Sequence, residues 1–131
     1  MATEFKRRVY ANVPAGTITV AAQQIYEAPN NCDTVVIGLL LTNTSGSSVT
    51  ADVGVIPQDN TEGPTNASTQ ENFTYLIKGA QIPVGSALEI ISGKVVLANT
   101  TSTAGDGDIL CVRASADNVM DATLSILENT P

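Results

Sequence analysis

Residues 82 to 128 read IPVGSALEIISGKVVLANTTSTAGDGDILCVRASADNVMDATLSILE, and this stretch decides the fold. It contains four short apolar runs separated by turn residues, with no histidine, no tryptophan and no cluster of catalytic residue types. Such a pattern predicts an antiparallel meander of strands. We expect those strands over residues 88–91, 94–98, 108–116 and 121–127, with a tight turn at Ser92-Gly93 between the first two.

The preceding part of the chain shows the same character. Residues 34–43, TVVIGLLLTN, form the most apolar run, which is typical of a central strand covered on both faces. Residues 48–56 alternate, with Val49, Ala51, Val53 and Val55 on one face. We expect these two segments to form a hairpin. Further strands are predicted over residues 5–13, 17–20, 23–28 and 73–78.

The predicted fold is therefore all-β. The chain is rich in Thr, Val, Ser, Asn and Ala, and β-branched residues favour strands over helices. Turn signals at short intervals, with no convincing helix, indicate an antiparallel β-sandwich of the Ig-like or jelly-roll type. We expect a single domain over residues 1–131, with an N-terminal arm over residues 1–8 and a long polar surface loop over residues 57–72.

Composition argues against several classes of function. The chain has 131 residues and a formal net charge of −7, which disfavours binding to nucleic-acid phosphates. No apolar stretch approaches the roughly 20 residues needed to cross a membrane. Because residues 1–8 are charged and lack the apolar segment of a signal peptide, we expect the chain to be made and kept in a cytoplasm until it is assembled.

The residues that usually carry catalysis are missing or scattered. Without histidine, a Ser or Cys nucleophile would lack its usual base, so we expect no enzymatic activity and no cofactor. Cys32 and Cys111 have no metal-ligand spacing; they are expected to be buried free thiols, although a disulfide stays possible. Asp106 and Asp108, in a Gly-rich loop, could offer oxygens to Ca²⁺, or could simply form a turn.

The surface is the more informative feature. Several strands have apolar residues on both faces, which indicates either central positions under loops or a face buried by another copy or another chain. Lys6, Arg7 and Arg8 fit either the polar face of a first strand or a contact to an acidic neighbouring subunit. The predicted interface residues are Phe5, Lys6, Arg7 and Arg8 in the arm, Pro57, Asp59, Glu62 and Pro64 in the loop, and Ile109 and Cys111 in the strand at 108–116.

Two segments carry a resemblance to a known class of proteins. The pattern IPVGSALEIISGKVVLANTTSTAGDGDILCVRAS followed by DATLSILE resembles small virion structural proteins of tailed phages, especially those that infect marine cyanobacteria. The segment NVPAGTITVAAQQIYEAPNNCDTVVIGLLLTNTSGSSVTADVGV is similar in style. The resemblance covers most of the chain from Val13 to Glu128, contains no catalytic motif, and implies a place on the head, neck, tail or baseplate.

These observations lead to one expected function and two alternatives. We expect a capsid decoration (cement) subunit, assembled in the host cytoplasm into the virion, that contacts the major capsid protein or other virion subunits and forms a homo-oligomer. The first alternative is a neck, tail or baseplate component. The second is a carbohydrate- or receptor-binding β-sandwich, which the small number of aromatic residues disfavours.

Overall fold

The structure, a computed structural model, describes residues 2–15, 24–29, 31–56, 74–99 and 107–130. Within these ranges it contains eight strands and no helix, which confirms the predicted all-β class. The strands are β1 (Ala2–Tyr10), β2 (Gln24–Glu27), β3 (Cys32–Asn43), β4 (Val49–Ile56), β5 (Thr74–Ile82), β6 (Ala87–Asn99), β7 (Ile109–Ala114) and β8 (Met120–Thr130).

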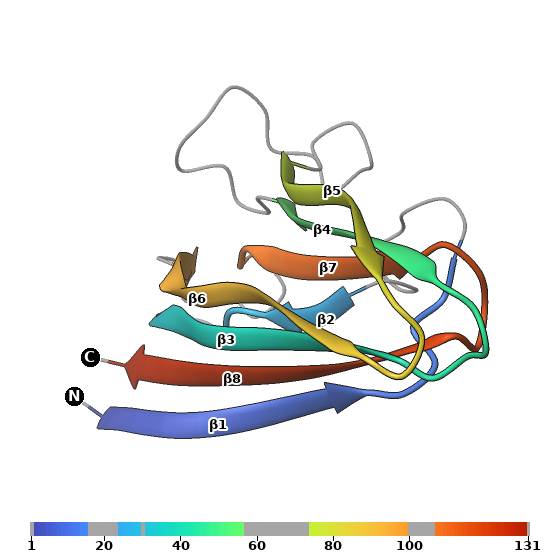
Figure 1. The fold of residues 1–131 in the computed structure, drawn as a ribbon. Helices are drawn as coiled ribbons and strands as arrows, with labels where there is room; N and C mark the ends of the chain where they lie inside the picture. Colours follow the sequence, from blue (N-terminus) through green and yellow to red (C-terminus); the bar gives the residue numbers. More distant parts are fainter. Residues whose placement is uncertain (1, 16–23, 30, 57–73, 100–106, 131) are drawn as a thin grey trace.

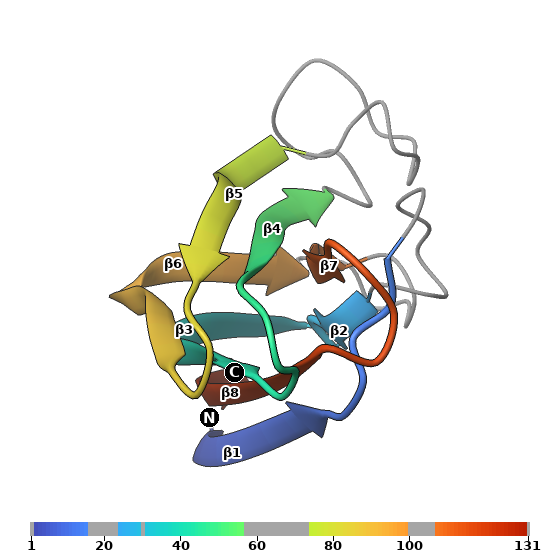
Figure 2. The same ribbon diagram turned by 45° about the vertical axis from the view of Figure 1, so that its right-hand side comes forward.

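The strands form two four-stranded antiparallel sheets that pack face to face (Figures 1 and 2). Sheet A has the order β1-β8-β3-β6, and sheet B has the order β2-β7-β4-β5. The pairs β1–β8, β2–β7, β3–β6 and β4–β5 nest inside one another, as in a single long hairpin. The pairs β3–β8 and β4–β7 then roll that hairpin into two layers. This topology is a jelly roll, which is one of the two sandwich types that the sequence predicts.

The core lies between the sheets and is aliphatic. Side chains alternate along each strand between this interior and the outside, as the period of two requires. On β8 the buried side chains are those of every second residue from Met120 to Glu128, so the predicted inward face of Ala122, Leu124 and Ile126 is confirmed. The largest core side chains on the other strands include Leu39, Leu41, Leu97, Leu110 and Ile82.

The hairpin predicted from residues 34–43 and 48–56 is wrong. Both segments are strands, but β3 lies in sheet A and β4 lies in sheet B, so the loop between them crosses from one layer to the other. Their apolar faces meet across the core instead of lying side by side. Alternation identifies the face that a strand buries, but it does not identify the strand's hydrogen-bonded neighbour.

The meander predicted from residues 82 to 128 is wrong for the same reason. β6 and β8 belong to sheet A, whereas β7, between them in sequence, belongs to sheet B. The tight turn predicted at Ser92-Gly93 is also wrong, because both residues lie inside the continuous strand β6. The pairing of β3 with β6 shifts register beside this point, where Gly93 and Lys94 of β6 lie opposite Ile37 of β3 and form a β-bulge. The predicted strand over residues 17–20 lies outside the described residues.

Gly107, just before β7, lies against Ala28, just after β2. The amide of Ala28 donates a hydrogen bond to the carbonyl of Asp108, with N and O 3.0 Å apart. A Cβ atom on Gly107 would lie 2.2 Å from the carbonyl oxygen of Ala28. Backbone atoms cannot move aside as the end of a flexible side chain can, so only glycine fits here.

We therefore expect Gly107→Ala to lower the free energy of unfolding by about 1–3 kcal/mol, the usual cost of forcing extra atoms into a packed site. The matched control is Gly46→Ala, because Gly46 is exposed and a Cβ atom there meets nothing within 4 Å. Urea denaturation followed by circular dichroism compares the two variants. Equal stability of both variants would contradict the packing argument.

Candidate interaction surface

Sheet A has an apolar row on its outer face that runs across all four strands. Phe5 of β1 lies opposite Leu127 of β8, Leu127 opposite Val35 of β3, and Val35 opposite Val96 of β6. Phe5 is 78% exposed and Val96 58% exposed at the two ends of the row, and the two residues between them are half-buried. A contiguous apolar surface of this kind usually marks a contact site.

Further exposed apolar side chains extend this row along the strands. Ile37, at the register shift of β3, and Leu40 are each 40% exposed, and Val9 of β1 is 69% exposed. The predicted covering of β3 on both faces is thus wrong within this chain, because its outer face is open. We call the following set the outer surface of sheet A: Phe5, Val9, Val35, Ile37, Leu40, Val96 and Leu127.

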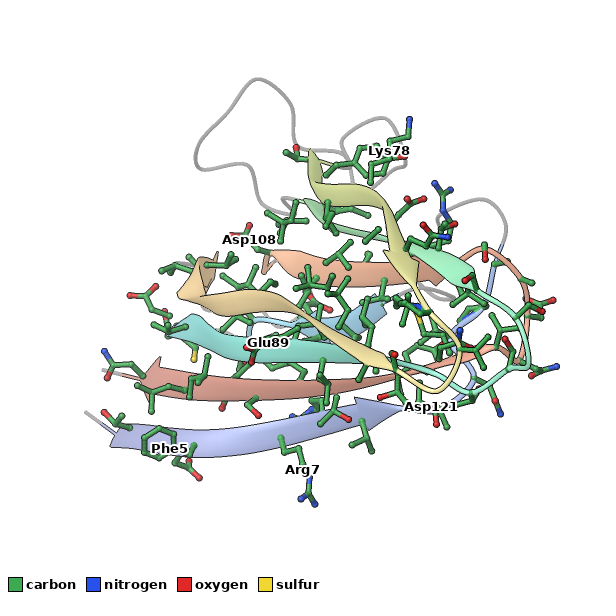
Figure 3. All side chains as sticks on the ribbon, viewed as in Figure 1. Phe5, Arg7, Lys78, Glu89, Asp108 and Asp121 are labelled. Carbon is green, nitrogen blue, oxygen red and sulfur yellow. The ribbon has the colours of Figure 1, made fainter. Side chains whose placement is uncertain are left out.

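Charged side chains are sparse on this surface and lie among the apolar ones. Arg7 projects away from β1 between Phe5 and Val9, and Glu89 of β6 extends over Gly38 of β3 (Figure 3). Its Oε2 atom lies 3.3 Å from the position that a Cβ atom on Gly38 would take. The surface therefore combines a large apolar area with the basic group of Arg7 near its β1 edge and with acidic groups that include Glu89 of β6 and the exposed Asp33 of β3.

The basic triplet of the sequence is divided by strand alternation. Residues 2–8 are not a free arm, because they lie in β1, which pairs with β8 along its whole length. Lys6 and Arg8 point to the inner side of sheet A: Lys6 forms an ion pair with Glu128 at 2.8 Å, and the Arg8 guanidinium lies 5.8 Å from the centre of the Tyr26 ring. Arg7 alone of the three points to the outer side. The triplet therefore does not act as one contact site.

A buried polar network, which the sequence did not predict, holds β1 in this position. The Tyr26 hydroxyl of sheet B donates a hydrogen bond to Oε2 of Glu128 at 2.5 Å and lies 2.8 Å from the Thr34 hydroxyl. Glu128 is only 5% exposed, and its other oxygen accepts from Lys6. This carboxylate therefore connects β1, β2 and β8 across both sheets. Its only signal in the sequence is a charged residue at an inward position of the last strand.

The protonation of the network follows from these contacts. Burial alone would raise the pKa of Glu128, but the hydrogen bonds from Lys6 and Tyr26 and the positive charge of Lys6 hold it below its ordinary value of 4.5. The hydrogen bond and charge of Glu128 raise the pKa of Lys6. Burial and the Glu128 hydrogen bond raise the pKa of Tyr26 well above its usual range, so its hydroxyl stays a donor.

Ile109 and Cys111, predicted as interface residues, are buried within the chain. They are 1% and 0% exposed and form a second small cluster with Ile56 of β4. Their neighbours Leu110 and Val112 lie in the main core, so β7 is buried on both faces by its own chain. Of the two explanations for a two-sided apolar strand, β7 fits the central position, and its assignment to an interface was wrong.

The two cysteines lie on different sheets and are both free and buried, as expected. The alternative of a disulfide is therefore excluded. Burial raises the pKa of the Cys111 thiol to about 12, which keeps it protonated and unreactive.

Most of the remaining predicted residues fall outside the part of the chain that the structure describes. Pro57, Asp59, Glu62, Pro64 and Asp106 lie outside the described residues, as does the rest of the loop over 57–72. Asp108 is described, and its Oδ2 atom accepts a hydrogen bond from the backbone amide of Ala98 at 3.1 Å, which fits the predicted structural role at the start of β7. Among the residues that the structure describes, no group of three or more His, Cys, Asp or Glu side chains is arranged to hold a metal ion.

Comparisons with known proteins add no assignment. No protein-family model matches the chain, and a search of curated proteins finds no match. In the described part of the chain, there is no helix with the length and hydropathy needed to cross a membrane.

We expect acid to destabilise the protein partly through Glu128. Its pKa is lower in the folded than in the unfolded state, so its contribution to stability is complete above its unfolded value and is lost as the pH falls through the folded value. Glu128→Gln should therefore be less stable at neutral pH and should lose less stability than wild type below pH 4.5. Urea midpoints measured across this range test the expectation. Glu4→Gln, which removes an exposed carboxylate opposite Glu128, is the control.

The burial of β7 on both faces gives a second test. Because Ile109 and Leu110 point to opposite faces but are both buried, Ile109→Asp and Leu110→Asp should each prevent folding. A buried unpaired charge costs several kcal/mol, about as much as the whole stability of a small domain. Val96→Asp, at an exposed position, should stay folded. Soluble yield and far-UV circular dichroism measure the outcome, and a folded Ile109→Asp variant would restore that face as a contact surface.

Proposed function

We propose that this chain is a structural protein of a tailed-phage virion, acting through protein–protein contacts of the outer surface of sheet A. The observation that carries the proposal is the exposed apolar row across all four strands, from Phe5 to Val96. An exposed apolar row is unfavourable for a soluble monomer, whereas a subunit that docks on a larger assembly buries it. The resemblance in residues 82–115 and 121–128 supplies the tailed-phage setting.

Within the virion, we propose a decoration subunit on the head that contacts the major capsid protein. The rigid aliphatic sandwich and the open face of sheet A fit a subunit that covers a surface. The acidic composition would keep many unassembled copies apart in solution. A neck, tail or baseplate position uses the same contacts, and the number of copies in a particle distinguishes the two.

The carbohydrate-binding alternative gains one observation from the structure. Phe5 is an exposed aromatic side chain, and sugar rings stack on such groups. The jelly roll is shared by viral capsid proteins and lectins, so it fits both functions. However, the neighbours of Phe5 across the sheet are Leu127, Val35 and Val96, which offer no hydrogen bonds to sugar hydroxyls. Binding to a glycan array would favour this alternative.

The proposal is tested on purified particles of the phage that encodes the chain. We expect the protein in these particles by quantitative mass spectrometry: hundreds of copies support decoration, and a dozen or fewer support the neck, tail or baseplate. Its absence from the particles would refute the proposed function.

The contact surface is tested by charge substitution. Ile37→Asp combined with Val96→Asp should stay folded but lose association with particles that lack the wild-type protein. Leu76→Asp is the matched control, because Leu76 is 41% exposed, like Ile37 at 40%, but lies on β5 of sheet B. Equal association of the two variants would exclude the outer surface of sheet A.

A further inference from the structure

The outer edge of β1 is the second unusual feature of sheet A. β1 is nine residues long and forms one end of the sheet, where among the described strands it pairs with β8 alone (Figure 1). One side of its backbone therefore presents donors and acceptors to which another strand can add. The apolar row of sheet A ends at this edge, on Phe5. The edge and the row would both be extended by the same partner.

We propose that this partner is a second copy of the chain, paired antiparallel through β1 about a two-fold axis at Phe5. Such an isologous contact uses the same edge of both copies and closes on itself. It joins the two A sheets into one of eight strands. The inference rests on the proposed structural role, to which it adds the homotypic contact.

Charge complementarity distinguishes the three registers near the centre of β1. In antiparallel strands, residues directly opposite each other have their side chains on the same face of the sheet. The two-fold axis must therefore lie where a residue stands opposite its own copy. With the axis at Arg7, Lys6 would lie opposite the second copy's Arg8; with the axis at Lys6, the two Lys6 side chains would lie opposite each other. Like charges in these positions destabilise a sheet. With the axis at Phe5, Glu4 lies opposite the second copy's Lys6, twice, and no like charges are opposed.

The apolar row supports the same register. With the axis at Phe5, the two Phe5 rings lie opposite each other on the outer face, a favourable aromatic cross-strand pair. The row of Val96, Val35, Leu127 and Phe5 then continues into the same row of the second copy in reverse order. The axis at Lys6 or Arg7 would place Arg7 or Val9 opposite Phe5 and offset the two rows.

An inward-pointing charge on an edge strand usually prevents such pairing. Here the charge of Lys6 is already compensated by Glu128 at 2.8 Å. An ammonium group has three donors, so Lys6 can donate a hydrogen bond to the second copy's Glu4 as well as to Glu128. The Lys6 ammonium thus has two acidic partners, Glu128 of its own chain and Glu4 of the second copy.

Cysteine cross-linking tests the register. Phe5→Cys places two thiols directly opposite each other, about 5 Å apart at Cβ, from which a disulfide can form. Val9→Cys is the matched control: Val9 is also exposed, on the same face of the same strand, but its two copies would be about 26 Å apart. Because Cys32 and Cys111 are buried, they should contribute no background. We expect covalent dimer from Phe5→Cys alone. No cross-linking of Phe5→Cys, or faster cross-linking of Val9→Cys or Arg7→Cys, would overturn the proposal.

Sedimentation of the free protein tests the contact itself. Wild type should show a monomer–dimer equilibrium with a dissociation constant below about 1 mM. Glu4→Lys should raise that constant about tenfold, because it places a lysine opposite the second copy's Lys6. Glu89→Lys, the same charge change at an exposed position on β6, should have no such effect. A monomer at all concentrations overturns the inference, even if it associates with particles. A dimer that does not associate with particles supports the inference and refutes the proposed function.

Discussion

The buried carboxylate of Glu128 is the group on which the arrangement of sheet A depends. It accepts hydrogen bonds from Lys6 of β1 and from Tyr26 of β2, so three strands in two sheets meet at one side chain. A carboxylate that is 5% exposed is tolerated only when its oxygens are satisfied, and both are. Non-directional aliphatic packing fills the core, but this network defines which residues of β1 face it.

The outer surface follows from that constraint. Once Lys6 faces the network, alternation places Phe5 and Arg7 on the opposite side of β1. A slip of one residue would expose Lys6, bury Phe5 and remove the row that ends there. The ion pair beneath β1 and the apolar row above it are thus two consequences of one register. The contact proposed for Phe5 therefore depends on Glu128, which lies on the opposite face of sheet A and near the other end of the chain.

The sequence predicted the elements of this fold better than their partners. β-Branched composition and period-two alternation identified the class and most strands, including the buried face of Ala122, Leu124 and Ile126. Neither property identifies which strands pair with each other, because in a jelly roll β3 pairs with β6 and β8 but not with β4. Of the predicted contact residues, Phe5 and Arg7 lie on the outer surface of sheet A, and their part in a contact stays a prediction. Two-sided apolar strands were ambiguous: Ile109 is covered by its own chain, whereas Ile37 stays open.

The electrostatics of the whole molecule and of β1 act in opposite directions. Two chains of net charge −7 repel each other over distances comparable to the Debye length, about 8 Å at physiological salt. β1 contains three of the six basic residues and, with Glu4, has a local excess of positive charge. Two copies that meet along this strand therefore also oppose like net charges, and it is the opposition of Glu4 to the second copy's Lys6 that offsets this repulsion in the proposed register. The acidic net charge thus disfavours random aggregation, while the paired charges of Glu4 and Lys6 permit the one contact proposed for β1, which is the property that a subunit needs before assembly.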